Sequence, residues 1–197
     1  MKNQFDEIID SYLENKVGID TCFMTERLSD GLQANILQLQ NNGQLTPAGI
    51  GNDVLKYVHQ QTRGDKICWL DKQNHNPFED EFLHLAEDFI AYLNATCYTG
   101  INACEFHYAV YEEGSFYKRH KDQFKNNSNR KYSLISYLNT GWLEEDGGQL
   151  MIYREKEIQR ILPQSQKAVF FKSDEMEHEV AVTSRRRLSV TGWLKCI

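Results

Sequence analysis

Apolar residues in the first half of the chain recur every three or four positions, as they do on one face of a helix. This spacing predicts helices over residues 5–15, 25–43 and 77–96. Gly43 is suited to cap the end of the second helix. Pro77, followed by acidic residues, is suited to begin the third.

Short apolar runs bounded by turn-forming residues dominate the chain from about residue 103. They predict strands over 104–113, 132–139, 147–155, 167–173, 177–183 and 187–195. Earlier strands are expected over 18–24 and 63–71, with a loop over 46–62. Helices followed by strands are typical of an α+β fold, in which a sandwich or barrel packs on helices. We therefore expect one domain over residues 1–197, with helical and strand support over about 1–102 and a β core over about 103–197.

Alternation within two strands separates an apolar face from a more polar one. In the last strand the apolar face holds Leu188, Val190 and Leu194, and the opposite face holds Arg187, Ser189, Thr191 and Trp193. In the strand over 132–139 one face holds Leu134 and Leu138, and the other holds Ser133, Ile135 and Tyr137. We expect the apolar faces to pack on helices and the opposite faces to line a cavity suited to a small charged ligand.

A candidate metal site begins with His120 and Asp122, two residues apart. In an extended segment both side chains point the same way and reach one ion. His178, at the entry of a late strand, is the best-placed third ligand. Two histidines and one carboxylate are the ligand set of non-haem Fe(II) oxygenases, which leaves positions open for a co-substrate and O2. The alternative is that these are unrelated surface groups, because a His-x-Asp pair alone is common by chance.

Arg187 follows His178 by nine residues. We expect a hairpin turn through 183–186 to bring it beside the metal on the neighbouring strand. An arginine facing into a barrel requires an anion. A dicarboxylate such as 2-oxoglutarate would chelate iron at one end and meet Arg187 at the other, with Tyr137 donating to the same carboxylate. The alternative places Arg187 in a solvated turn with the two arginines before it.

These residues together resemble the motif of the Fe(II)- and 2-oxoglutarate-dependent prolyl 4-hydroxylases. The branch that it resembles most contains the hypoxia-inducible-factor prolyl hydroxylases and their bacterial homologues. The likeness covers residues 16–195 and includes RGDKICWL at 63–70, YKRHKD at 117–122, SYLN at 136–139, GGQLMIY at 147–153, VFFKSD at 169–174 and HEVAV at 178–182. RGDKICW discriminates best, because many oxygenases share the metal motif alone.

The resemblance implies a double-stranded β-helix, or jelly-roll, core flanked by N-terminal helices. It implies that His120, Asp122 and His178 bind iron and that Arg187 is a catalytic residue that binds 2-oxoglutarate. Tyr137, Tyr111, Ile135 and Thr191 are assigned to the same co-substrate pocket, and Tyr117, Trp193, Arg130, Arg63 and Asp65 to the substrate rim, where Asp65 is expected to pair with Arg63 or Arg130.

The implied activity is hydroxylation of a prolyl residue at C4 in a protein substrate. 2-Oxoglutarate would be converted to succinate and CO2, with O2 as co-substrate and ascorbate as reductant. In this family the loop over 46–62 covers the substrate, and its sequence departs here from the animal enzymes. We therefore favour a bacterial protein with a different target, of which a translation factor is one example.

Two other functions stay open on the sequence. One is a 2-oxoglutarate oxygenase acting on another residue type, a free amino acid or a nucleic acid. The other is a non-catalytic module that senses the metal or 2-oxoglutarate. The 22 basic and 28 acidic residues give a net charge of −6, which argues against nucleic acid.

Composition limits the compartment and the assembly. No apolar run has the length of a membrane span or the features of a signal peptide, so no membrane partner is expected. Five scattered cysteines, without a Cys-x-x-Cys pair, argue for a reducing compartment and against a disulfide framework. We expect a cytoplasmic monomer. The other four histidines, at 59, 75, 84 and 107, are expected to be structural or exposed.

Overall fold

The structure is a computed structural model that describes residues 3–49, 62–123, 128–155 and 157–197. Its helices are α1 (Asp6–Asn15), α2 (Glu26–Asn41) and α3 (Pro77–Cys97), with short 3-10 helices η1 (Lys72–Asn74) and η2 (Glu144–Asp146). The three α-helices lie within about two residues of the expected bounds. Among the described residues no helix is both long and apolar enough to cross a membrane.

The strands form two antiparallel sheets. The larger has the order β1-β9-β6-β11-β4-β3-β2 and the smaller the order β5-β10-β7-β8. Their bounds are β1 Val17–Asp20, β2 Thr46–Pro47, β3 Lys66–Trp69, β4 Ala103–Tyr111, β5 Tyr117–His120, β6 Arg130–Tyr137, β7 Leu150–Tyr153, β8 Ile158–Ile161, β9 Ala168–Lys172, β10 Glu177–Val180 and β11 Arg187–Lys195. Helices and two facing sheets confirm the expected α+β fold with a jelly-roll core.

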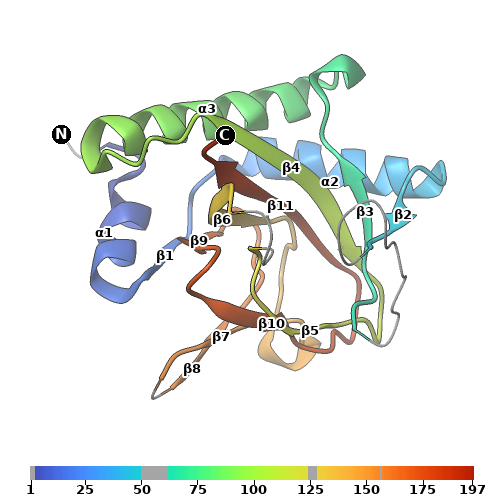
Figure 1. Cartoon of the computed structure of the whole chain (residues 1–197). Helices are drawn as coiled ribbons and strands as arrows, with labels where there is room; N and C mark the ends of the chain where they lie inside the picture. The colour runs from blue at the N-terminus through green and yellow to red at the C-terminus, as the bar shows by residue number, and fades with distance from the viewer. Residues whose placement is uncertain (1–2, 50–61, 124–127, 156) are drawn as a thin grey trace.

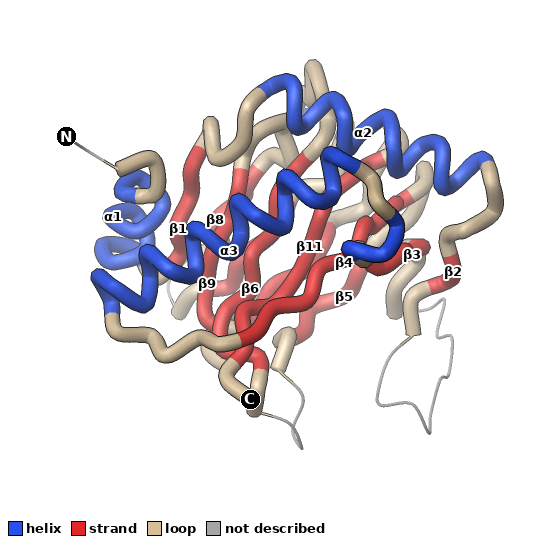
Figure 2. The backbone as a smooth tube through the Cα atoms, turned by 90° about the horizontal axis from the view of Figure 1, so that it is seen from above, coloured by secondary structure: helices blue, strands red, loops and turns tan. Residues whose placement is uncertain are grey.

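The helices cover one face of the larger sheet, as Figure 2 shows from above. There α2 and α3 run across its strands, while α1 lies at the β1 edge. In Figure 1 the smaller sheet lies on the side away from α2 and α3. Side chains fix where the two long helices begin, because Thr25 accepts a hydrogen bond from the Leu28 amide and Asn76 accepts from the Phe78 amide.

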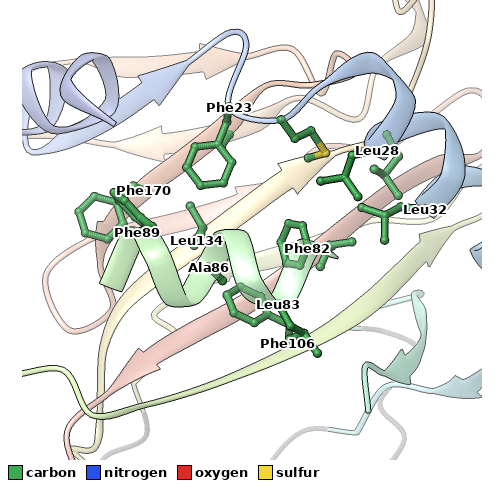
Figure 3. Close-up of a cluster of buried hydrophobic side chains, with 14 of the residues drawn as sticks. Phe23, Leu28, Leu32, Phe82, Leu83, Ala86, Phe89, Phe106, Leu134 and Phe170 are labelled. Carbon is green, nitrogen blue, oxygen red and sulfur yellow. The ribbon is translucent and has the colours of Figure 1, made fainter. Parts of the chain in front are cut away.

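Aromatic rings fill the layer between α3 and the larger sheet (Figure 3). Phe89 is fully buried, and its ring centroid lies 5.3 Å from that of Phe170 on β9 and 5.6 Å from that of Phe23. Phe82 meets Phe106 of β4 edge to face at 5.2 Å. Edge-to-face pairs of this kind add to the free energy of burial. This layer holds the outer face of the larger sheet rigid, so the inner face is free to carry polar groups.

Several expected elements differ in the structure. The strand over 18–24 is shorter, because residues 21–24 turn away from β9 towards α2. The short strands β2, β5 and β8 were not predicted, since runs of two to four residues carry little periodicity. Most of the loop expected over 46–62 lies outside the described residues. The five cysteines are free; Cys22 is exposed, and the other four are half-buried.

Replacing Phe89 by alanine should lower the free energy of unfolding by about 3–5 kcal/mol, the usual cost of a large cavity in a core. The matched control is Leu13→Ala, because Leu13 is 63% exposed and its loss should cost no more than about 0.5 kcal/mol. Urea unfolding followed by circular dichroism measures both. Equal midpoints for the two variants would contradict the packing described for α3.

Candidate active site

The three predicted ligand residues come together at one end of the smaller sheet. His120 ends β5 and stands directly opposite His178 on β10, and Asp122 follows two residues after His120. One donor atom from each lies within 4.8 Å of the other two. Asp122 Oδ1 is 3.3 Å from His120 Nε2 and 3.6 Å from His178 Nε2. Their role as ligands stays a prediction, but the cross-strand pairing explains why residues 58 positions apart meet.

Second contacts orient each donor. The Nδ1 atoms of His120 and His178 lie 2.7 and 3.2 Å from the carbonyl oxygens of Lys118 and Met176, so each Nδ1–H has an acceptor and each Nε2 keeps its lone pair. Ser133 Oγ donates to Asp122 Oδ2 at 2.6 Å, which leaves Oδ1 for another partner. Two imidazole nitrogens and one carboxylate oxygen around one point fit a divalent first-row metal.

The charges of this cluster match the same role. Burial alone would raise the pKa of Asp122, but His178, His120 and the Ser133 hydroxyl outweigh it and hold that pKa well below its ordinary value. Burial lowers the pKa of His178, with Asp122 opposing. At neutral pH the cluster therefore holds one carboxylate and a neutral His178 imidazole, which is the protonation that metal binding needs.

A cavity of about 570 Å³ lies between the two sheets and includes the ligand cluster. Of the residues predicted for the co-substrate pocket and the substrate rim, it is lined by Arg187, Tyr111, Ile135, Thr191, Tyr117, Trp193, Arg130, Arg63 and Asp65. Tyr137 does not line it but lies behind Arg187, with its ring centroid 5.0 Å from the guanidinium carbon. The faces of β6 and β11 that alternation predicted to be inward therefore do point toward the cavity.

Arg187 is a buried cation without an ionic partner among the described residues. Its side chain is 1% exposed, and its Nε donates to the Gly148 carbonyl at 2.8 Å. The rings of Tyr111 and Tyr137 flank it at 5.1 and 5.0 Å. Burial raises the pKa of Tyr137 to about 12, with Arg187 opposing, so this phenol stays neutral. A buried guanidinium beside neutral phenols requires an anion that the described residues do not supply.

The Tyr137 hydroxyl points to the same need. It is buried and has no hydrogen-bond partner among the residues that the structure describes. Buried hydroxyl groups in native proteins are nearly always hydrogen-bonded, so an unpaired one beside an unpaired cation marks a place for a ligand acceptor. A carboxylate fits both groups, because it offers several acceptor positions and a negative charge.

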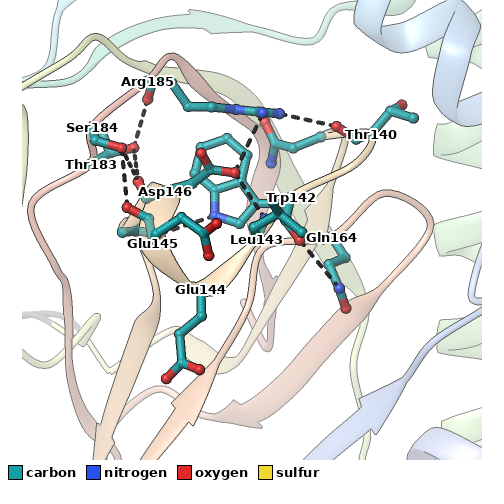
Figure 4. A network of polar contacts seen from close by, with 12 residues as sticks. Thr140, Trp142, Leu143, Glu144, Glu145, Asp146, Gln164, Thr183, Ser184 and Arg185 are labelled. Atoms are coloured by element: carbon teal, nitrogen blue, oxygen red, sulfur yellow. Dashed lines mark hydrogen bonds and ion pairs between the residues drawn. The ribbon is translucent and has the colours of Figure 1, made fainter.

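The segment between β10 and β11 carries the chain from one sheet to the other and is held by a polar network (Figure 4). The Asp146 carbonyl accepts from the Ser184 amide at 2.9 Å, and the Asp146 carboxylate pairs with Arg185 at 3.4 Å. Arg185 also lies over the Trp142 ring at 4.5 Å. The hairpin predicted through 183–186 is therefore wrong, because the crossing places Arg187 on the sheet opposite His178.

Arg187 is the first residue of β11, which belongs to the larger sheet because it pairs with β4 and β6 rather than with β10. Gly148 also contributes to this placement. Its backbone φ is +63°, and a Cβ there would lie 3.1 Å from Arg187 Cδ. The glycine thus lets its own carbonyl approach the arginine closely.

Two arginines at the outer end of the cavity are already paired. Arg63 grips Asp65 with two hydrogen bonds of 2.7 and 2.6 Å and lies over the Tyr117 ring at 4.2 Å. Arg130 pairs with Glu105 at 2.9 Å and lies over the Trp193 ring at 3.3 Å. Of the two partners expected for Asp65, the structure selects Arg63.

Sequence reasoning missed some residues of the site. Ser133 was placed on the cavity face by alternation but was not linked to Asp122, because only the fold brings them together. Glu105 and Trp69 also line the cavity. His107 is buried and lies in the cavity wall. Alternation along β4 would have found it, because His107 lies an even number of residues from Tyr111 and so shares its inward face. Of the other three, His75 and His84 are exposed, and His59 lies outside the described residues.

Comparisons with known proteins agree with this geometry. The family model of the 2OG-Fe(II) oxygenase superfamily matches residues 106–195, which include the ligand cluster and Arg187. A prolyl-4-hydroxylase from Pseudomonas putida is similar in structure, with a TM-score of 0.88, 29% identity, and coverage of 98% of this chain and 99% of that one. A Trichoplax adhaerens prolyl hydroxylase, solved with a hypoxia-inducible-factor peptide, gives a TM-score of 0.87 at 23% identity, covering 96% of this chain and 88% of that one.

Ser133→Ala should weaken binding of Co(II) or Mn(II) by about 10- to 100-fold, because Asp122 loses the hydrogen bond that orients its carboxylate. Ser136→Ala is the matched control, since Ser136 is equally buried on β6 and its hydroxyl has no partner among the described residues. Isothermal titration calorimetry measures both affinities. Equal losses in the two variants would show that Ser133 only contributes to packing.

Proposed function

The chain carries a domain of the 2OG-Fe(II) oxygenase superfamily, and from this premise we propose that it hydroxylates a prolyl residue of a protein substrate at C4. 2-Oxoglutarate is converted to succinate and CO2 in the same turnover. One observation carries the proposal: a single cavity holds a His-Asp-His cluster on one sheet and an unpaired buried arginine on the other. A metal-chelating dicarboxylate has the two ends that this pair of sites requires.

The protein's own residues bind and orient the reactants. His120, His178 and Asp122 would hold Fe(II), which supplies the oxygen-activating chemistry when bound. Ser133 fixes the Asp122 carboxylate so that one oxygen stays directed at the metal position. Arg187 is proposed to hold the distal carboxylate of 2-oxoglutarate, which leaves the keto acid end toward the ligand cluster.

The remaining co-substrate residues shape the pocket around this salt bridge. Tyr137 would donate its unpaired hydroxyl to the same carboxylate. Tyr111 covers the guanidinium with its ring, and Ile135 and Thr191 line the wall between the two ends. These groups exclude water around the carboxylate, so its pairing with Arg187 becomes stronger than in solution.

The substrate is proposed to enter at the outer end of the cavity, where Tyr117, Trp193, Arg130 and Arg63 line the wall, with Asp65 holding Arg63 in place. Flat rings suit a prolyl ring, which has no N–H to donate. The Trichoplax adhaerens prolyl hydroxylase, solved with a hypoxia-inducible-factor peptide, supports a protein substrate. We propose a target different from that of the animal enzymes, of which a translation factor is one example, with O2 as co-substrate and ascorbate as reductant. The enzyme is proposed to be a cytoplasmic monomer of one domain.

Tyr137→Phe should raise the apparent KM for 2-oxoglutarate about 10- to 100-fold, because a hydrogen bond to a charged group contributes about 1.5–3 kcal/mol. Tyr132→Phe is the matched control on the same strand, since Tyr132 packs on the helical side against Phe170, with ring centroids 4.9 Å apart. Succinate formation at varied 2-oxoglutarate measures both. An unchanged KM in Tyr137→Phe would remove this tyrosine from the co-substrate site.

Incubation in an extract of the source cells, with Fe(II), ascorbate and 2-oxoglutarate, tests the function itself. Mass spectrometry should find at least one proline that gains an oxygen atom with the wild type and not with Asp122→Ala, which loses the charged ligand of the cluster. Succinate without a modified proline would keep the oxygenase and overturn the prolyl substrate. Absence of both signals would favour the non-catalytic sensor.

A further inference from the structure

We propose that His107 determines specificity for the substrate chain by donating a hydrogen bond from its Nε2–H to a backbone carbonyl near the target proline. The inference rests on the proposed function and names the contact that recognises a polypeptide. It assigns a role to a buried polar side chain that neither the ligand cluster nor the co-substrate pocket uses.

The register of the larger sheet places His107 at the outer end of the cavity. On β4 it shares one face with Ala109 and Tyr111, and Tyr111 stands opposite Arg187 of β11. At about 3.4 Å per residue, His107 lies roughly 13 Å from Tyr111 along the strand. Its partner across the sheet is Trp69 of β3, which is 47% exposed and lines the same cavity. Its other cross-strand partner is Thr191 of β11, so His107 lies beside the wall of the co-substrate pocket and four residues along β4 from the Arg187 position.

Aromatic rings hold the imidazole in place. The Trp193 ring stacks on it with centroids 5.3 Å apart and an interplanar angle of 30°. The Trp69 ring meets it edge to face at 5.0 Å. His107 is only 3% exposed, yet its Nδ1 has no hydrogen-bond partner among the described residues. A rigidly held ring whose Nδ1 has no partner among these residues is suited to bind a ligand through its other nitrogen, because ordering it on binding costs little.

Its surroundings decide which proton it carries. Burial lowers the pKa of His107 to about 4, with Arg63 and Arg130 acting in the same direction and Asp65 and Asp122 opposing, so the ring is neutral. An N–H buried without an acceptor is rarer in proteins than an unpaired acceptor. The proton therefore belongs on Nε2 rather than on the buried Nδ1. His107 then presents a neutral donor to the cavity that it lines.

The charges around this donor favour a neutral acceptor. The two nearby arginines, Arg63 and Arg130, are already paired with Asp65 and Glu105, so neither of them requires a carboxylate from the substrate. A peptide carbonyl is a neutral acceptor and occurs at every residue of a chain, including proline. The flanking tryptophan rings provide apolar surface for the prolyl ring beside it.

Two substitutions separate hydrogen bonding from packing. His107→Phe keeps a flat ring between Trp69 and Trp193 and removes the donor, whereas His107→Gln keeps a donor and removes the ring. The probe is a pool of synthetic peptides with one central proline and randomised flanks, with hydroxylation measured by mass spectrometry. We expect His107→Phe to raise the apparent KM for the pool about 10-fold and His107→Gln to restore part of it. His84→Phe, an exposed site on α3, is the matched control and should match the wild type.

The tautomer gives a readout that does not depend on turnover. Long-range 1H–15N correlation spectra of the metal-free protein should show His107 protonated on Nε2 between pH 6 and 8, and the peptide pool should shift that resonance. Protonation on Nδ1, or a wild-type KM in His107→Phe, would overturn this inference alone. A wild type that forms succinate and hydroxylates no peptide, either in the pool or in the extract, would overturn the proposed function as well.

Discussion

A buried positive charge without a negative partner among the described residues is the constraint on which the site depends. The Arg187 guanidinium lies in the space between the two sheets, with one backbone carbonyl and two neutral phenol rings around it. Such a group is costly until an anion reaches it. Three features keep this cation in position for an anion. They are the glycine at 148, the polar network around Asp146 and the unpaired Tyr137 hydroxyl.

Packing on the other face of the larger sheet stabilises the fold and offsets the free energy that burying the Arg187 charge costs. Phenylalanine rings from α3 and β9 pack edge to face, and the helices leave the inner face of the sheet to carry polar side chains. The two faces of a single strand can have these two separate roles. β6 places Leu134 in the aromatic layer and its neighbour Ser133 beside Asp122, so one strand contributes to both stability and the site.

The sequence was sufficient for features that depend on period and order. Alternation separated Arg187 and Thr191 from Leu188, and the fold keeps that separation. It was not sufficient for contacts that depend on which strands pair. The predicted neighbour of β11 was β10, and this was wrong, because β11 pairs with β4 and β6. A short turn has the same sequence pattern whether the chain returns to its own sheet or crosses to the facing one. His107 was not predicted as a site residue for a related reason: only the packing shows that its Nδ1 has no hydrogen-bond partner among the described residues.

The sharing of the ligand cluster between layers has a consequence for the lifetime of the protein. His120 and His178 belong to the smaller sheet, while Asp122 is fastened to β6 of the larger one through Ser133. An ion bound to all three would become an additional cross-link between the two layers. Binding to the folded state alone raises stability by mass action. The supply of iron would thereby affect how long each molecule resists unfolding and proteolysis. A shortage of iron would lower the amount of folded enzyme as well as its activity.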